Sequence, residues 1–482
     1  MKAKPAFYLL LLTAGALFVH GYHPYAEDAA FYIPPVKKLL NPALYPHGAE
    51  FFQSHAALTL FPNLMAGSVR TLHLPLDGVL LVWHLLTIYL FLLGCWKVSC
   101  LCFDEQAARW CAVTLVAALL TMPVAGTALF LMDQYVNPRS FSAFTGMFAV
   151  ARALERRYAR AMVWLLGTAL VHPLMPVYGI FFILLVAWNQ SRVLKTELAA
   201  LLVLGFSFER PTEAYHQAAL LHWQHYVMRW PWYCWVGILA PIAVFYWFGR
   251  VARARRMPNV ELLCRSLVTF VLVSLLGALI LDIPQRFEAL ARLQPLRSLH
   301  LAYVLMVLLV GGMTSEFFLK RRVWRWLLLF APLCAAMAYV QFQLFPATAH
   351  IEWPGAASRN AWVQTFEWVS QNTPVDAYFA LDPLYLERAG EDEQSFRAIA
   401  ERSMLADVLK DSGAVTMFPR LAEKWWEQAE AHRDWNSFGA VDFQRLKTRY
   451  GVNWVLLSRP PSADLRCPYH NQNNHLAVCQ VH

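Results

Sequence analysis

The stretch PAFYLLLLTAGALFVHGYHPYAEDAAFY (residues 5–32) decides the fold, because an apolar run passes directly into an aromatic and acidic segment. Lys2 and Lys4 precede the run, as they would in a signal peptide, but no A-x-A-like cleavage site ends it. We therefore expect an uncleaved membrane helix over residues 5–20, with its N-terminus in the cytoplasm and the acidic segment on the outer side.

The composition extends this pattern over the whole chain. Of the 482 residues, 58% are hydrophobic and 15% are charged, whereas soluble domains have roughly 45–50% and about 25%. The excess lies in apolar runs, many of them long enough to cross a bilayer. We expect a polytopic α-helical membrane protein of about eleven spans. These lie near residues 5–20, 78–98, 109–131, 139–153, 160–173, 174–188, 197–208, 233–249, 261–281, 297–318 and 323–343.

The formal charge of +9 comes from short basic clusters between the apolar runs, such as ERRYAR, GRVARARR and KRRVWRW. With the N-terminus inside, every strongly basic short loop falls on the cytoplasmic side, as the positive-inside rule requires. The charge therefore indicates orientation. Because the chain has no basic soluble domain or nucleic-acid-binding motif, we expect no nucleic-acid partner.

Residues 56–72, AALTLFPNLMAGSVRTL, are the weak point of this topology. A full span here would invert every later loop and place ERRYAR outside. We therefore interpret the segment as a juxtamembrane or re-entrant helix on the outer face. An even number of spans is the alternative.

The character of the chain changes near residue 347, where mixed helix and strand signals replace the apolar runs. The helix-like and strand-like stretches are ASRNAWVQTFEWVSQNTP, AYFALDP, FQRLKTRYG and VNWVLLSRP. We expect two parts: a transmembrane domain over 1–346, which includes an outer loop at 21–77, and a soluble α/β domain over 347–482 on the outer side.

The nine cysteines fit this division, since seven lie in or beside apolar runs. Cys467 and Cys479 close a terminal hairpin, and on the oxidising side of a membrane we expect them to form a disulfide. With His470 and His475 they also match a zinc-like spacing, C-x-x-H…H-x-x-x-C. That match is isolated, so we predict no metal site there.

Glu27 and Asp28 are the first candidate for chemistry. A carboxylate pair at a membrane surface can supply a general base, because partial desolvation and mutual repulsion raise one pKa toward neutrality. The alternative is structural, since Asp28 immediately precedes a helix-like stretch and could cap it.

The second candidate lies in LFLMDQYVNPRSFSAF, where Asp133, Asn137 and Arg139 stand between two apolar runs. Pro138 is well placed to begin the next helix, and Arg139 at that position can present a fork to a phosphate or carboxylate. An internal salt bridge between Asp133 and Arg139 is the equally weighted alternative.

The third candidate is a group of outer-side cations in DIPQRFEALARLQPLRSLH, of which Arg286 and Arg297 are the principal members. Arginines on the outer side oppose the usual charge bias and suit an anionic head group. Ordinary pairing with Asp282 and Glu288 is the alternative. His222 and His225, one turn apart nearby, are better explained by an interfacial aromatic belt than by a metal site.

The layout resembles the GT-C superfamily of membrane glycosyltransferases, which use polyprenyl-phosphate sugars. The resemblance rests on YHPYAEDAAFY and VKKLLNPALYP after the first helix, on the many spans that follow, and on the soluble outer tail. The stretches AGTALFLMDQYVNPRSFSAF, WLLGTALVHPLMPVYG, WVSQNTPVDAYF and YGVNWVLLS resemble a bacterial branch of such proteins, from which no specific reaction is carried over.

The resemblance implies a glycosyltransferase in a bacterial inner membrane, with its C-terminal domain in the periplasm. Asp28 would be the base that activates the acceptor, with Glu27 as neighbour or alternative, because the order here is Glu-Asp where Asp-Glu or Asp-Asp is commoner. Its partners would be the membrane, a lipid-linked sugar donor and an acceptor of unspecified identity. No second acidic motif with a metal-binding spacing follows, so the resemblance does not imply metal dependence. A divalent metal is the open alternative, and no other cofactor is implied.

Two other functions remain open from the sequence. A non-catalytic scaffold or assembly protein would use the tail to bind partners. A transporter of lipid-linked or polar solutes predicts inverted repeats and charges near the membrane midplane, and neither is evident. ATP-driven and zinc-protease functions lack their Walker and H-E-x-x-H motifs.

Overall fold

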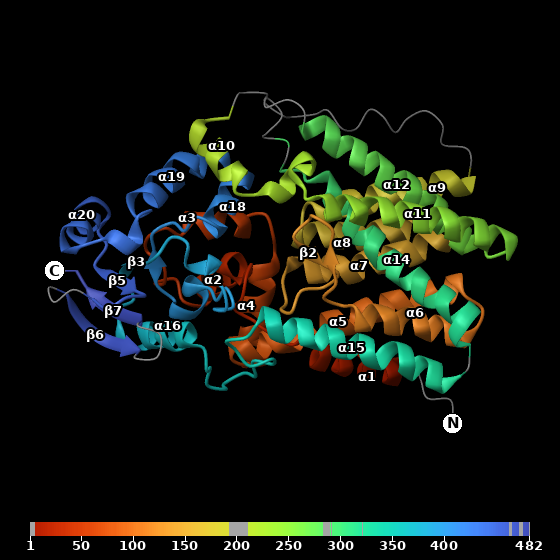
Figure 1. The fold of residues 1–482 in the computed structure, drawn as a ribbon, viewed down its shortest axis with the longest axis horizontal. Helices are drawn as coiled ribbons and strands as arrows, with labels where there is room; N and C mark the ends of the chain where they lie inside the picture. The colour runs from red at the N-terminus through yellow and green to blue at the C-terminus, as the bar shows by residue number, and fades with distance from the viewer. Residues whose placement is uncertain are drawn as a thin grey trace. The chain divides into compact units, whose positions relative to one another are not determined.

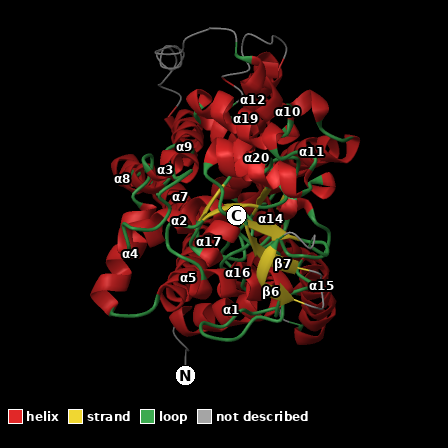
Figure 2. Cartoon of the chain, turned by 90° about the vertical axis from the view of Figure 1, so that its left-hand side faces the viewer, coloured by secondary structure: helices red, strands yellow, loops and turns green. Residues whose placement is uncertain are grey.

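The computed structural model describes residues 5–191, 211–282, 290, 292–320, 322–461, 465–471 and 476–481. These residues are mostly helical (Figures 1 and 2). The chain divides into two compact units. Unit 1 comprises Met1–Gly21, Val82–Arg210 and Trp223–Gln341, and unit 2 comprises Tyr22–Leu81, Pro211–His222 and Phe342–His482. The tail from residue 347 therefore shares a unit with the loop that follows the first helix. The expected domain boundary at residue 346 stays a prediction.

Unit 1 is built almost entirely from helices. Those that lie wholly or mainly in it are α1 (Pro5–His20), α5 (Leu76–Cys102), α6 (Gln106–Ala118), α7 (Pro138–Leu154), α8 (Tyr158–Val171), α9 (Met175–Ser191), α11 (Trp232–Ala254), α12 (Pro258–Asp282), α14 (Leu299–Thr314) and α15 (Val323–Leu344). Short helical turns are η2 (Trp223–His225), η3 (Val227–Arg229), η5 (Pro295–Ser298) and the π-helical η6 (Ser315–Leu319). Nearly every side chain of α7 is buried, which makes α7 a central helix of this unit.

Five helices are long and apolar enough to cross a membrane: Leu76–Cys102, Trp232–Ala254, Pro258–Asp282, Pro295–Leu319 and Val323–Leu344. Each coincides with a predicted span. Three shorter apolar helices, Pro5–His20, Tyr158–Val171 and Met175–Gln190, also lie at predicted positions. The chain is thus a largely helical protein with five candidate membrane helices among the described residues, and the count of eleven stays a prediction.

The predicted span at 109–131 is wrong, because these residues do not form one continuous helix. Residues 109–118 form most of α6, which stops at Ala118, and the rest of the predicted span contains an antiparallel hairpin of β1 (Pro123–Val124) and β2 (Leu129–Phe130). Pro123 has no N–H to donate to a helix, and Gly126 adopts the left-handed φ of +64° that the turn requires. An apolar run alone does not distinguish this arrangement from one continuous helix.

Two other expected segments have different outcomes. The predicted span at 197–208 lies outside the described residues. Within 56–72, the structure has α4 (Phe61–Leu72), a helix of 12 residues. At 1.5 Å per residue, such a helix is about 18 Å long, which is too short for a hydrocarbon core of about 30 Å. The segment is therefore not a single spanning helix.

Unit 2 combines short helices with one mixed sheet. Its helices are α2 (Ala29–Leu40), α3 (Glu50–Ala56), α4, α10 (Glu213–Leu220), α16 (Ala361–Asn372), η7 (Tyr385–Glu387), α17 (Phe396–Ala400), α18 (Lys410–Met417), η8 (Pro419–Leu421), α19 (Ala422–Ala431), η9 (Trp435–Ser437) and α20 (Ala440–Tyr450). Its strands are β3 (Tyr378–Ala380), β4 (Ser403–Met404), β5 (Trp454–Leu457), β6 (Arg466–Asn471) and β7 (Leu476–Gln480). The predicted tail helices and strands at α16, β3, α20 and β5 are confirmed.

The sheet has the strand order β4-β3-β5-β7-β6. Strand β3 pairs in parallel with β4 and β5, whereas β7 pairs antiparallel with β5 and β6. Alternate residues of β5 enter two different cores, because successive side chains of a strand point to opposite faces. Trp454 packs with residues of α16 and α17, and Val455 packs with residues of α20. Both faces of the central strands are therefore covered.

Candidate functional site

The acidic segment after α1 is held by the C-terminal part of the chain, within unit 2. Tyr22 forms a parallel bridge with Ile351: its N–H donates to the carbonyl of His350 at 2.9 Å, and its own carbonyl accepts from the N–H of Glu352 at 3.0 Å. The buried His23 contacts the Glu352 carboxylate through Nδ1 at 2.8 Å. The loop thus begins as an ordered, strand-like segment.

A second pairing fixes the loop next to the two acidic residues. Ala26 forms an antiparallel bridge with Gln394, and the N–H of Glu27 donates to the carbonyl of Glu393 at 3.2 Å. Both glutamates lie in the left-handed region, with φ of +51° at Glu27 and +46° at Glu393. Non-glycine residues adopt this conformation when surrounding contacts hold them there, and such residues gather at functional sites.

Asp28 directly precedes α2, but its side chain makes no capping hydrogen bond to that helix. Its backbone is itself helical, with φ of −72° and ψ of −3°, whereas a capping residue has an extended backbone. The Asp28 carboxylate is half-buried, and its Oδ1 lies 3.4 Å from Nζ of Lys410. The structure therefore replaces the capping alternative with an ion pair to the tail.

Lys410 is the first residue of α18 and forms an ion pair with Asp28. Its Nζ also lies 3.9 Å from Oε2 of Glu393. Burial acts to lower the pKa of Lys410, but the negative charges of Asp28, Glu393 and Glu27 outweigh it. The pKa of Lys410 consequently lies above its ordinary value, and this side chain is a firmly charged ammonium.

A buried ion-pair network lies beneath Lys410. Arg397 of α17 donates to Asp411 through both terminal nitrogens, each at 2.7 Å, and its Nη1 lies 3.9 Å from Oδ2 of Asp407. All three side chains are at most 4% exposed. Burial, together with the charge of Asp411, raises the pKa of Asp407 to about 7. Two carboxylates share one guanidinium, and their mutual repulsion favours the protonated form of Asp407.

Sequence reasoning missed Lys410, Asp407, Asp411 and Arg397. The only signal is the polar spacing D-x-x-K-D over residues 407–411, which is unremarkable in a region that reads as soluble. Nothing local indicates that Lys410 meets Asp28, because 382 residues separate them.

Asp133, Asn137 and Arg139 do come together, within unit 1 and in the form of the structural alternative. Nη2 of Arg139 donates to Oδ2 of Asp133 at 2.9 Å, and the Asn137 side chain accepts from the N–H groups of Arg139 and Ser140 at the start of α7. All of these residues are buried. The structure thus contains the internal salt bridge and a helix cap, and a phosphate-binding role for Arg139 stays a prediction.

Arg297 lies on η5 and lines a small cavity of unit 1 with a volume of about 30 Å³, which is room for one or two water molecules. Ser142, Thr168 and His300 contribute polar groups to the same pocket, whose other lining is largely apolar. Nε2 of His300 lies 2.9 Å from the carbonyl oxygen of Leu131. The pocket therefore combines one cation, several neutral polar groups and an apolar lining.

The other predicted cations and ligands have separate outcomes. Arg286 and Glu288 lie outside the described residues. The carboxylate of Asp282 accepts a hydrogen bond from the N–H of Met228 at 2.7 Å. His222 lies 2.9 Å from the Ser412 hydroxyl in unit 2, whereas His225 lies 2.7 Å from Nε2 of Gln294 in unit 1.

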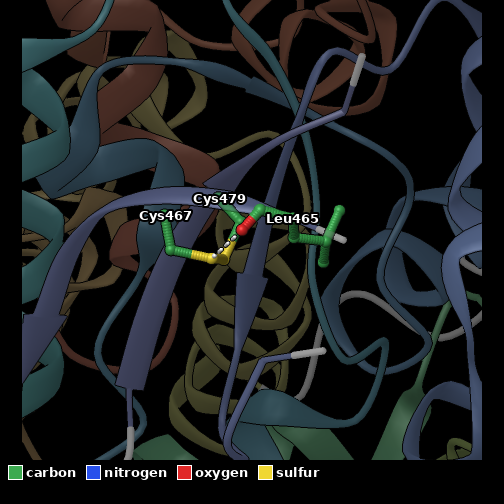
Figure 3. Close-up of a disulfide and its surroundings, with 3 residues drawn as sticks. All are labelled: Leu465, Cys467 and Cys479. Carbon is green, nitrogen blue, oxygen red and sulfur yellow. Dashed lines mark hydrogen bonds between the residues drawn. A yellow bond between two sulfur atoms is a disulfide. The ribbon is translucent and has the colours of Figure 1, made fainter. Parts of the chain in front are cut away.

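The structure joins Cys467 and Cys479 in a disulfide (Figure 3). The bridge connects β6 to β7, the last two strands of the sheet. Both sulfurs are therefore committed to a covalent bond between the strands.

Comparison with known proteins places the chain in no family. No protein-family model matches it, and no relative is found among curated protein sequences. Among solved structures, the crystal structure of the Archaeoglobus fulgidus oligosaccharyltransferase in the apo form is similar, with a TM-score of 0.47 and 11% sequence identity. The similarity covers 95% of this chain and 70% of that chain. At this TM-score the likeness establishes no shared fold.

Proposed function

We propose that this protein is a GT-C-type membrane glycosyltransferase, which transfers a sugar from a polyprenyl-phosphate carrier to an acceptor hydroxyl. Its setting would be the outer face of a bacterial inner membrane, with a cytoplasmic N-terminus and an extracytoplasmic C-terminal region. The proposal rests on the sequence resemblance around Glu27 and Asp28 and on the chemistry of the residues described above.

Asp28 is assigned the role of general base. It accepts the proton of the acceptor hydroxyl while the acceptor oxygen attacks the anomeric carbon and inverts its configuration. The bond between that carbon and the phosphate oxygen breaks, and the lipid phosphate leaves with the bonding electrons as an anion. Proton transfer to a positioned carboxylate accelerates such a step by about 10²- to 10⁴-fold.

The observation that carries this assignment is that the Asp28 side chain does not cap α2. A carboxylate used as a helix cap would be committed to the backbone N–H groups of α2, but Asp28 makes no such bond and its side chain is 26% exposed. It is held on a loop with two separate backbone pairings to the tail. A carboxylate that does not cap its helix and that an ammonium holds in place is consistent with a catalytic role.

Arg297 is assigned to the phosphate of the donor. A guanidinium can make two parallel hydrogen bonds to a phosphate and stabilise the charge that develops as the phosphate leaves. The cavity beside Arg297 is too small for an isoprene group, and the hydroxyls of Ser142 and Thr168 already donate to the carbonyls of Pro138 and Trp164. The assignment therefore rests on the guanidinium of Arg297 alone. Asp133, Asn137 and Arg139 are better explained by the packing of α7, with a second phosphate contact from Arg139 as the alternative.

The test is a sugar-transfer assay with the purified full-length protein in lipid nanodiscs. A panel of polyprenyl-phosphate hexoses and pentoses is offered to the wild type, to Asp28→Asn and to Glu27→Gln. Asp376→Asn serves as the matched control, because Asp376 is an exposed acidic residue of the same unit. We expect Asp28→Asn to lose at least about 100-fold in kcat, whereas Glu27→Gln loses much less and the control is unchanged.

The outcomes separate the three candidate functions. Equal activity in the wild type and Asp28→Asn would remove the base assignment. No transfer with any donor would favour the scaffold, and movement of the lipid-linked sugar between leaflets without transfer to an acceptor would favour the transporter.

A further inference from the structure

We infer that Lys410 is a positioning residue for Asp28: it fixes the carboxylate of the base and supplies the positive charge beside it. The inference rests on the proposed role of Asp28 and deepens it, because it makes the C-terminal region part of the catalytic apparatus. Neither the acidic motif nor the resemblance assigns any role to this lysine.

The first step of the argument is the placement of the carboxylate. Oδ1 of Asp28 lies 3.4 Å from Nζ of Lys410, whereas no cap bond ties the same side chain to α2. The neighbouring backbone is tied to the tail by the bridge between Ala26 and Gln394 and by the bond from the N–H of Glu27 to the Glu393 carbonyl. The segment that carries the base and the segment that leads to its cation are therefore joined by their backbones.

The second step is the fixed position of Lys410 itself. Oδ1 of Asp407 accepts from the N–H groups of Lys410 at 2.6 Å and of Asp411 at 3.2 Å, so Asp407 holds the first turn of α18. The Asp411 carboxylate in turn accepts hydrogen bonds from the two terminal nitrogens of Arg397. A lysine at an unsupported helix end would sample many rotamers, but this one projects from a turn that a buried ion pair anchors.

The third step concerns charge. Three carboxylates, of Glu27, Asp28 and Glu393, act on the single ammonium of Lys410. Without a cation, their mutual repulsion would favour proton uptake by one of them. An ammonium at ion-pair distance favours the ionised form of Asp28, which is the form that accepts a proton. Lys410 thereby keeps Asp28 ionised at a lower pH than would be the case without the ammonium.

The first experiment measures the pair without any need for activity. Lys410 in the full-length protein is labelled competitively with a small amine-reactive reagent across a pH range, and its pH midpoint is read by mass spectrometry. We expect the midpoint to fall in Asp28→Asn relative to the wild type, because the nearest negative charge is removed. Lys424, which pairs with Glu50, is the internal control and should not move. An unchanged Lys410 midpoint would overturn the inference.

The second experiment measures the consequence for transfer. In Lys410→Met we expect kcat to fall by about 10- to 100-fold and the acidic limb of the pH–rate profile to move up by about one to three pH units. Lys410→Arg keeps the charge, so its kcat and its acidic limb should stay close to those of the wild type. Lys424→Met removes a paired lysine elsewhere in unit 2 and should change neither.

A merely structural lysine would give a different result. Lys410→Met would then lose thermal stability without a shift of the pH limb, and this would overturn the inference while leaving Asp28 as the base. A wild type that transfers no sugar, although its Lys410 midpoint responds to Asp28→Asn, would overturn the proposed function and with it the catalytic role of the pair.

Discussion

Asp28 and Lys410 lie 382 positions apart in the chain, yet their side chains meet at 3.4 Å. This contact ties the loop after the first helix to the C-terminal region within a single compact unit. The loop and the tail therefore belong to the same compact unit, together with Pro211–His222.

Arg297→Gln should weaken the use of the lipid donor. Removing the guanidinium takes away a charge-assisted contact to phosphate, worth about 1.5–3 kcal/mol, so we expect KM for the donor to rise by about tenfold or more. Initial rates at varied donor concentration measure this. Arg265→Gln changes an exposed arginine of α12 and serves as the control. Equal KM values in the wild type and Arg297→Gln would contradict the assignment.

Arg397→Met should destabilise unit 2. The substitution leaves Asp407 and Asp411 buried without their shared cation, and breaking a buried pair costs about 3–5 kcal/mol. Thermal unfolding in detergent measures the loss. Arg445→Met removes an arginine from the exposed pair with Asp442, for which we expect less than about 1 kcal/mol. A similar small effect for both variants would show that the buried network is not stabilising.

The high pKa of Asp407 gives stability a defined pH dependence. Its pKa is about 7 in the folded protein, held up by burial and by Asp411, but is near 3.9 in an unfolded chain. The folded state therefore binds an extra proton between these values, and this contribution to stability is full below about pH 4 and lost as the pH rises through about 7.

Asp407→Asn tests this dependence, because asparagine also holds a helix N-terminus but does not titrate. The free energy of unfolding of the wild type, relative to that of Asp407→Asn, should be greater at pH 4 than at pH 8 by up to about 4 kcal/mol. Parallel pH profiles of the two proteins would show that Asp407 is not the group responsible.

The disulfide should contribute measurably to unit 2. The Cys467–Cys479 bridge closes a loop with a sequence separation of 12 residues, and a loop of this size restricts the unfolded chain by about 3 kcal/mol. We expect Cys467→Ala/Cys479→Ala to unfold at a lower temperature than the wild type, and reducing agent to lower only the wild-type value. No response of the wild type to reductant would contradict a formed bridge.

The sequence predicted features that depend on local composition. The long apolar helices, the strand β5 and the pairing of Cys467 with Cys479 follow from runs, alternation and spacing within short segments. The span at 109–131 was wrong, because Pro123 and Gly126 turn an apolar run into a hairpin.

The site was only half predictable. Asp28 could be proposed from its place after the first helix, but only the path of its side chain shows that it makes no cap bond to α2. Lys410 could not be named, since its position beside Asp28 depends on the pairing of distant segments and on the Arg397–Asp411 ion pair beneath it. Long-range pairing of this kind leaves no local pattern.

The central claim is that Asp28 accepts the proton of the acceptor hydroxyl during sugar transfer. Its most direct test is the single-turnover rate of transfer as a function of pH, in the wild type and in Asp28→Asn. The wild-type rate should rise about tenfold per pH unit at acidic pH and then level off, while Asp28→Asn should keep a residual rate at least about 100-fold lower that lacks this rise. A variant that keeps the wild-type plateau and the same acidic limb would contradict the claim.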